Sequence, residues 1–318
     1  MYRLVRTAFI HSSGLIAIVV TLAAIGNLLL LCQPVQRFSP ALLAWWTGLC
    51  AVSVCNIWLW RRSAEAVAWR KGLVDPEIFV LQRRQLLLAA VYVLGCAFRA
   101  LLPRADVQRL GLFDTWVSSV LVGRSVATVA ELCFAVQWAL FLHHFAKQAD
   151  CRFGIVIARL FVPLIFVAEI CSWYGVLTTD YFGNTIEESI WAVAGALLVV
   201  GLLLLWRRTP SSVRPAVSVA ILLGTAYVAY LCAVDVPMYA GRWLADEANG
   251  REYLTLSQGL WDAGSRWNVS HAWEEWYPEI SWMTLYFSLG VWCSIGLIHV
   301  PRGISSEPRP GVAIPAAV

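Results

Sequence analysis

Carboxylate and arginine side chains lie inside apolar stretches of this chain. Arg124 and Glu131 fall within the apolar stretch 117–142, and Glu169 falls within the next, 155–178. An ionisable residue inside a membrane span is costly and usually faces the bundle interior or a water-filled cavity, so each marks a candidate functional site. A carboxylate there suits general acid–base catalysis or proton transfer, and an arginine suits the binding of a carboxylate or phosphate group.

Helical spacing brings several of these residues onto common faces. Arg124, Thr128 and Glu131 follow the i, i+4, i+7 pattern of one helical face, and Trp173 follows Glu169 by one turn. The predicted catalytic residues are Glu131, Arg124, Glu169 and Asp235. The predicted substrate-binding residues are Arg99, Arg104, Arg109, Arg242, Trp173 and Glu279.

Other familiar chemistries have no motif in the sequence. The nine cysteines include no CxxC pair, which is typical of small buried apolar residues rather than of a redox centre. The only lysines, Lys71 and Lys147, fall in predicted inner loops, which excludes a Schiff-base lysine within a span. His271 and Glu274 have the spacing of two ligands on a helix, but no metal-site motif is present, so we predict no metal and identify no cofactor.

Apolar segments long enough to cross a bilayer must position these residues. The chain has 318 residues, of which 59% are hydrophobic and 14% charged, whereas a soluble domain has about 25% charged residues. A helical span needs about 20 apolar residues, and about eight stretches approach that length. They are 13–33, 40–60, 84–102, 117–142, 155–178, 188–206, 215–235 and 279–299. We predict an all-α, polytopic integral membrane helix bundle, with one transmembrane domain over 1–300 and a disordered cytoplasmic tail over 301–318.

The distribution of lysine and arginine predicts the orientation. With both termini inside, sixteen of the 24 lysines and arginines fall in inner segments and six in outer loops, as the positive-inside rule requires. The segment 236–278 then becomes a long exoplasmic loop, rich in tryptophan and acidic residues, which serves either as a lid or as an interfacial aromatic belt.

This orientation places most membrane-edge charges in the outer half of the bilayer. They include Glu187, Glu188 and Asp235, besides Arg99 and Glu279. The functional interpretation is a polar cavity open to the exoplasmic side, with Arg124 and Glu131 at its floor. The structural interpretation is that carboxylates in first helical turns, Glu187, Glu188 and Glu279, are stabilised by the helix dipole alone.

Three classes of function fit these residues. The first is a membrane-embedded enzyme that acts on an amphiphilic or lipid-linked substrate in the outer cavity. The second is a proton- or ion-coupled transporter that uses Glu131 and Glu169. The third is a non-catalytic subunit that docks through its tryptophan-rich loop. Expected partners are membrane lipid and other membrane subunits in a bacterial inner membrane, and no nucleic acid, because no basic patch is interleaved with aromatic residues.

Overall fold

Seven long apolar helical runs form the body of the protein. The computed structural model describes residues 38–300, and each of these runs is long and apolar enough to cross a membrane. They are α2 (Pro40–Trp69), α3 (Pro76–Leu101), α4 (Val120–Gln148), α5 (Arg152–Thr178), α6 (Tyr181–Trp206), the joined α7 (Arg214–Tyr230) and α8 (Val236–Ala248), and the joined α10 (Trp273–Leu285) and α11 (Val291–Leu297). The chain is a multi-pass integral membrane protein of all-α class.

The seven runs coincide with seven of the apolar stretches predicted from sequence. The remaining stretch, 13–33, and the tail 301–318 lie outside the described residues. The predicted helical membrane bundle is therefore confirmed. The total number of spans and the inside location of both termini stay predictions.

Local capping groups explain why several helices begin before their apolar run. Pro40 and Pro76 occupy the first turns of α2 and α3, where a missing N–H costs nothing. Asp180 caps α6 by accepting a hydrogen bond of 2.9 Å from the N–H of Phe182. Glu187 consequently lies in the second turn of α6 rather than in its first. The interpretation of Glu187 as a mere helix-end carboxylate was wrong, because the dipole effect fades beyond the first turn.

The expected long loop 236–278 is shorter than predicted at both ends. A π-helical segment, Leu231–Asp235, joins α7 to α8 directly, so the helix continues past Pro237 to Ala248. The wider π turn precedes the proline, whose ring would otherwise disturb a regular helix. At the other end α10 starts at Trp273 and contains Pro278. Asp235 therefore lies within a helical run instead of closing one.

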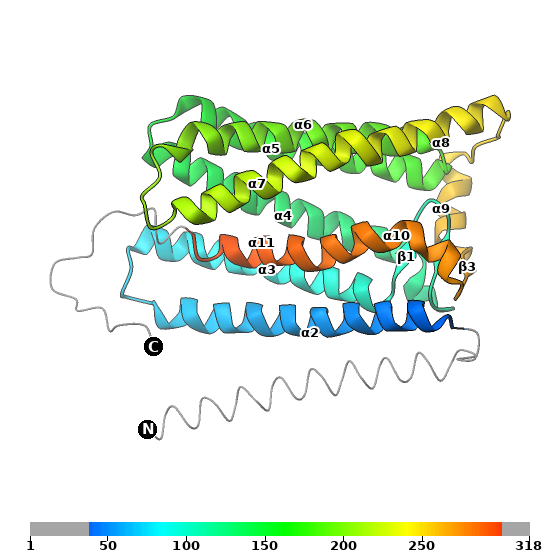
Figure 1. Cartoon of the computed structure of the whole chain (residues 1–318), viewed down its shortest axis with the longest axis horizontal. Helices are drawn as coiled ribbons and strands as arrows, with labels where there is room; N and C mark the ends of the chain where they lie inside the picture. Colours follow the sequence, from blue (N-terminus) through cyan, green and yellow to red (C-terminus); the bar gives the residue numbers. More distant parts are fainter. Residues whose placement is uncertain (1–37, 301–318) are drawn as a thin grey trace, which may run out of the picture.

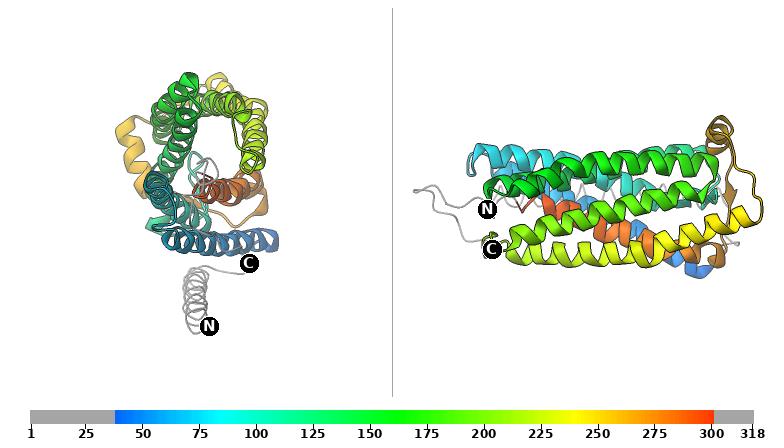
Figure 2. Two further views of the ribbon diagram at one scale, coloured as in Figure 1. Left: turned by 90° about the vertical axis from the view of Figure 1, so that its left-hand side faces the viewer. Right: turned by 90° about the horizontal axis from the view of Figure 1, so that it is seen from above.

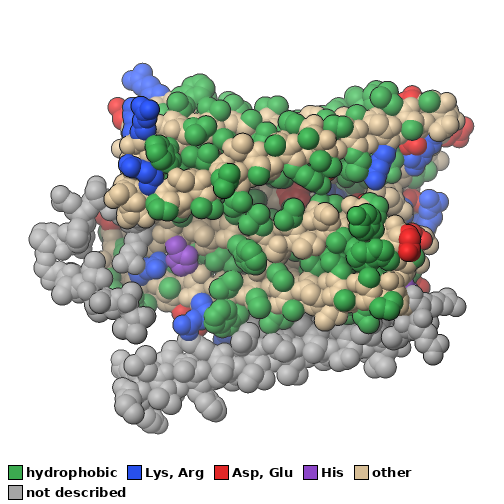
Figure 3. All heavy atoms as spheres, viewed as in Figure 1, with side chains coloured by type: hydrophobic (Ala, Val, Ile, Leu, Met, Phe, Trp, Pro, Cys, Tyr) green, Lys and Arg blue, Asp and Glu red, His purple; other side chains and the backbone are tan. Residues whose placement is uncertain are grey.

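The helices run side by side along the long axis of the molecule and form a ring when viewed end-on (Figures 1 and 2). Consecutive helices from α2 to α7 pack against one another, whereas α10 and α11 pack on α2, α3 and α4. Figure 3 shows the surface hollowed between α7 and the α10–α11 run, with acidic side chains visible inside. We call this hollow the side opening. It agrees with the sparse burial of α7, where Val217 is the buried residue, and of α8, which has none.

Loops join at one end of the bundle to form a small cap. Strands β1 (Arg104–Ala105) and β2 (Leu110–Gly111) pair antiparallel, and β2 pairs in parallel with β3 (Asn268–Val269). The short helix α9 (Leu256–Ser265) packs on α5 and α4 beside this sheet. The cap thus ties the α3–α4 connection to the segment that precedes α10. Basic side chains gather at the opposite end, at the left of Figure 3.

Candidate functional site

Arg124 of α4 lies among three buried carboxylates from three helices. One of its guanidinium nitrogens, Nη2, lies 2.9 Å from Glu169 Oε2, 3.0 Å from Glu187 Oε1 and 3.6 Å from Glu131 Oε2. All four residues are buried. Oxygens of the three carboxylates lie within 4.8 Å of one another. We call these four residues the Arg124 cluster.

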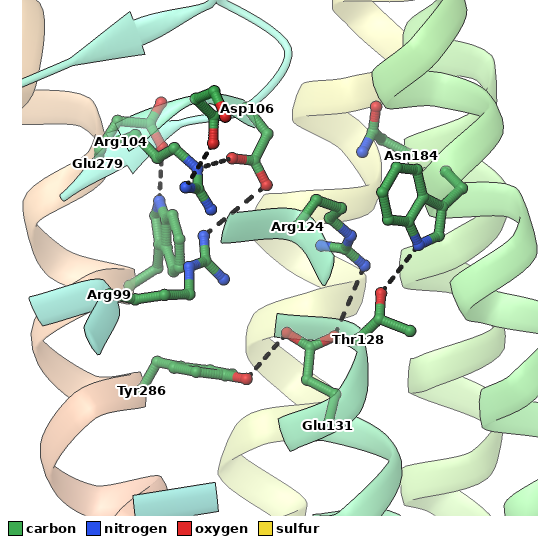
Figure 4. A network of polar contacts seen from close by, with 12 residues as sticks. Arg99, Arg104, Asp106, Arg124, Thr128, Glu131, Asn184, Glu279 and Tyr286 are labelled. Atoms are coloured by element: carbon green, nitrogen blue, oxygen red, sulfur yellow. Dashed lines mark hydrogen bonds and ion pairs between the residues drawn. The ribbon is translucent and has the colours of Figure 1, made fainter. Parts of the chain in front are cut away.

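Neutral donors fix two of the carboxylates in place (Figure 4). Thr128 donates a hydrogen bond of 2.6 Å to Glu169, and the indole N–H of Trp173 donates to Thr128 over 3.0 Å. The hydroxyl of Tyr286 donates to Glu131 Oε1 over 2.8 Å. Since Tyr286 comes from the α10–α11 run, it links the far wall of the side opening to the cluster on α4 and α5.

A close approach of α5 and α6 positions the third carboxylate. A Cβ atom on Gly183 would lie 2.5 Å from the backbone nitrogen of Gly175, so the two helices touch through glycine. Next to this contact, the amide of Asn184 donates to Glu187 Oε2 over 3.1 Å. The helix contact therefore directs Glu187 toward Arg124 of α4.

The cluster carries more negative than positive charge. Within the described residues, Arg124 is the one basic side chain that contacts its three carboxylates, so full ionisation would leave two uncompensated charges. Glu188 forms no hydrogen bond or ion pair with the described residues and adds to this excess from α6. Uncompensated charge in a low-dielectric interior is very costly. The arrangement therefore favours uptake of a proton or of a cation, and its oxygens are of the kind that hard cations prefer.

A second charged group lies in the cap, above the cluster. Arg104 Nε contacts Asp106 Oδ1 at 2.7 Å, and Arg104 Nη1 donates to the carbonyl of Ser119 over 3.0 Å. Burial alone would raise the pKa of Asp106, but the guanidinium groups of Arg104, Arg99 and Arg124 outweigh it and hold that pKa below its usual range. Burial in turn lowers the pKa of the Arg104 guanidinium. The Arg104 guanidinium is therefore already paired with groups of the protein.

Glu279 of α10 and Arg99 of α3 both contact Trp282. Glu279 accepts hydrogen bonds from Trp282 Nε1 at 2.6 Å and from Gln108 Nε2 at 3.1 Å. The guanidinium of Arg99 lies 5.8 Å from the centre of the Trp282 ring and 3.8 Å from Asp106. These contacts connect the α10 wall to the cap (Figure 4). Glu279, like Glu187, lies beyond the first turn of its helix, so the helix-dipole interpretation was wrong for it too.

Two of the predicted binding arginines lie apart from the cluster. Arg109 Nε contacts Asp262 at 2.7 Å and stabilises the cap. Arg242 belongs to α8, where its guanidinium lies over the rings of Tyr181 and Tyr239. These contacts give Arg109 a structural role and place Arg242 beside the first turn of α6.

The histidine singled out by its spacing serves packing. The ring of His271 stacks on Phe38 with 3.9 Å between centroids, and its Nε2 lies 3.0 Å from the carbonyl oxygen of Leu112. The ring and Nε2 of His271 are thus both in contact with other groups of the protein.

Tyr227 lies on α7, one of the two helical runs that border the side opening (Figure 3). Tyr227 of α7 is 43% exposed although it lies within electrostatic range of Glu188, Glu131 and Asp235. Tyr286, on the run at the other side of the opening, connects this region to the Arg124 cluster through its hydrogen bond to Glu131.

The bundle is closed by neutral groups between the cluster and its basic end. Gln85 Nε2 donates to the carbonyl of Gln137 over 2.8 Å, and Gln137 Nε2 donates back to the carbonyl of Gln85 over 3.1 Å. Ser294 of α11 donates to the side chain of Gln137 over 2.5 Å. These three buried residues hydrogen-bond to one another and carry no titratable group, although Gln85 Oε1 accepts no hydrogen bond from the described residues. No charged route continues through them.

Sequence reasoning assembled part of this site correctly. Arg124 and Glu131 share a face of α4, as their helical spacing predicted, and Glu169 of α5 joins them; Trp173 reaches the same group through Thr128. Glu187 was missed as a cluster member because its helix was expected to begin at 188. A capping aspartate at 180 was the signal that could have corrected this boundary. Tyr286 gave no sequence signal.

Comparison with models of known protein families, with curated proteins and with solved structures found no match. The geometry of the site therefore carries the functional argument.

Proposed function

We propose that this protein is a membrane-embedded enzyme that acts on an amphiphilic substrate at the Arg124 cluster. The observation that carries the proposal is the position of the cluster, which is buried on three helices and joined through Tyr286 to the α10–α11 run that borders the side opening. Buried carboxylates that share one arginine are poised to accept and return protons. A lateral opening between helices admits molecules that are dissolved in the bilayer.

The contacts assign different roles to the cluster residues. Glu131 serves as the general acid–base, because its carboxylate lies nearest the α10–α11 wall and is oriented by Tyr286. Arg124 stabilises negative charge that develops in the transition state. Glu169 and Glu187 hold the guanidinium in place, with Thr128 fixing Glu169.

The charge balance also defines the substrate class. Arg104 and Arg109, which the sequence marked as phosphate-binding groups, are paired with Asp106 and Asp262. An excess of carboxylates repels phosphate and favours an uncharged or cationic head group. We therefore narrow the expected amphiphilic or lipid-linked substrate to a neutral or cationic amphiphile.

A proton- or cation-coupled carrier is the second candidate, and the carboxylate excess favours it. A carrier also needs a polar route to the basic end, which the positive-inside rule places in the cytoplasm. The neutral contacts of Gln85, Gln137 and Ser294 lie in that path. The closed inner half therefore supports the enzyme over the carrier.

The test uses vesicles made from a total membrane lipid extract that contain the purified full chain. Wild-type protein should convert at least one amphiphile that mass spectrometry detects, and Glu131→Gln should abolish this conversion. Glu247→Gln is the matched control, because Glu247 is an exposed carboxylate that also accepts a tyrosine hydrogen bond, from Tyr253 at 3.0 Å. This control should convert the same amphiphile at the wild-type rate.

Two results would contradict the enzyme. One is conversion by Glu131→Gln at the wild-type rate. The other is an unchanged lipid profile together with proton flux, measured by a pH dye trapped in the vesicles, that Glu131→Gln removes. The second result would establish the carrier.

A further inference from the structure

A groove of about 420 Å³ lies between the first turns of α3 and the last turns of α4. It is at the basic end of the bundle, opposite the cap. Arg84 contributes from α3, and His143, His144 and Lys147 contribute from α4. Glu77 is the one acidic residue in its lining. The groove is thus large enough for a small ligand and is predominantly basic.

The two fully charged cations of this groove are available to a ligand. Arg84 and Lys147 are exposed, and neither forms a hydrogen bond or ion pair with the described residues. Their side chains converge on the groove from two different helices. Unpaired cations on opposite walls provide charge complementarity for a phosphate group.

An apolar track continues from the groove along α3. Val80, Arg84, Leu87, Val91 and Leu94 share one helical face by their spacing. The leucines and valines on this face are 39–61% exposed. From Arg84 to Leu94 the helix rises about 15 Å, which is about half the thickness of the hydrocarbon core. The track therefore has the length of one acyl chain in a single leaflet.

We propose that this groove binds an anionic phospholipid of the leaflet at the basic end. Its phosphate lies between Arg84 and Lys147, and an acyl chain follows the exposed face of α3. The apolar track favours a lipid over a soluble phosphate as the ligand, because a soluble phosphate has no acyl chain to contact it. The site is at the far end of the bundle from the Arg124 cluster and does not depend on the proposed reaction.

Native mass spectrometry of the purified full chain in detergent tests this site. The protein is titrated with phosphatidylglycerol and, in parallel, with phosphatidylcholine of the same chains. We expect wild type to prefer phosphatidylglycerol by about tenfold or more, since each basic residue near an anionic lipid contributes appreciably to binding. The double variant Arg84→Ala/Lys147→Ala should lose this preference. Arg152→Ala/Arg207→Ala removes two exposed cations at the same end and should keep it.

Further measurements separate the alternatives. Glycerol phosphate, which has the head group without chains, should not displace the lipid at the same concentration. Displacement by it would overturn the lipid assignment in favour of a soluble anion. Equal loss of preference in both double variants would also overturn the proposal, because general surface charge would then explain binding. The single variant Arg84→Glu, checked for folding by gel filtration, should bind phosphatidylglycerol no better than phosphatidylcholine.

Discussion

Replacing Arg124 with methionine should be among the most destabilising single changes in this protein. The side chain contacts Glu169, Glu187 and Glu131 at 2.9, 3.0 and 3.6 Å. Removing one partner of a buried ion pair costs about 3–5 kcal/mol, because the remaining charge stays buried without compensation. Here three carboxylates lose one shared cation. We expect a loss of unfolding free energy at the upper end of that range.

Neutralising a carboxylate should cost much less unfolding free energy than removing Arg124. Glu131→Gln removes one of the excess negative charges and leaves an amide oxygen to accept from Tyr286. Its cost should stay within about 1 kcal/mol. The double variant Arg124→Met/Glu187→Gln should be more stable than Arg124→Met alone, since fewer unpaired charges remain. A stability gain from adding Glu187→Gln to Arg124→Met is expected if unpaired charge is the cause of the loss. Simple loss of packing would not give this gain.

The assay is reversible unfolding in mixed detergent micelles, followed by tryptophan fluorescence. Arg159→Met is the matched control, because Arg159 is exposed on α5 and forms no ion pair with the described residues. It should change the unfolding free energy by about 0.5 kcal/mol or less. Two results would contradict the charge imbalance. One is a loss of unfolding free energy for Arg124→Met no larger than that for Glu131→Gln, and the other is further destabilisation of Arg124→Met by Glu187→Gln.

Three other changes test separate contacts. Tyr286→Phe removes a hydrogen bond to a carboxylate, so it should cost about 1.5–3 kcal/mol of unfolding free energy and reduce turnover in the vesicle assay. Asp106 has a lowered folded-state pKa, so its stabilisation is complete above the usual value of 3.8 and is lost as the pH falls through the folded value. The stability difference between wild type and Asp106→Asn, measured by thermal unfolding, should therefore persist at about pH 5 and shrink at about pH 3; a constant difference would contradict this. Gly123→Ala places a Cβ in the space of the buried Arg104 guanidinium and should cost about 1–3 kcal/mol. Gly48→Ala, which meets nothing within 4 Å in α2, should stabilise by up to about 1 kcal/mol in the same measurement; equal effects of the two alanines would refute the steric argument.

Sequence patterns predicted the helices well because apolar length is a direct physical requirement of the bilayer. The same patterns misplaced helix ends, since ends are decided by capping groups and by polar turns that continue a helix outside the apolar core. Asp180 and Pro237 illustrate the two cases. The first starts α6 well before its apolar stretch, and the second lies within a run that the sequence treated as ended.

The candidate site was predictable only where its residues share a helix or follow helical spacing. Arg124, Thr128 and Glu131 are such a set on α4. Contacts that cross between helices depend on how each helix is rotated and packed, which one sequence does not reveal. The hydroxyl of Tyr286 meets Glu131 across 155 positions of the chain, so no local pattern connects them.

Two π-helical segments lie on the two helical runs that border the side opening. Leu231–Asp235 ends with Asp235, and Tyr286–Gly290 begins with the tyrosine that donates to Glu131. A π turn inserts one extra residue into a helix and so rotates every side chain that follows relative to a regular helix. Such segments recur at functional sites, where that rotation aims a side chain that a regular helix would point elsewhere. The coincidence of both segments with the opening therefore supports a site that is shaped by helix irregularity, in which the second segment presents Tyr286 to Glu131.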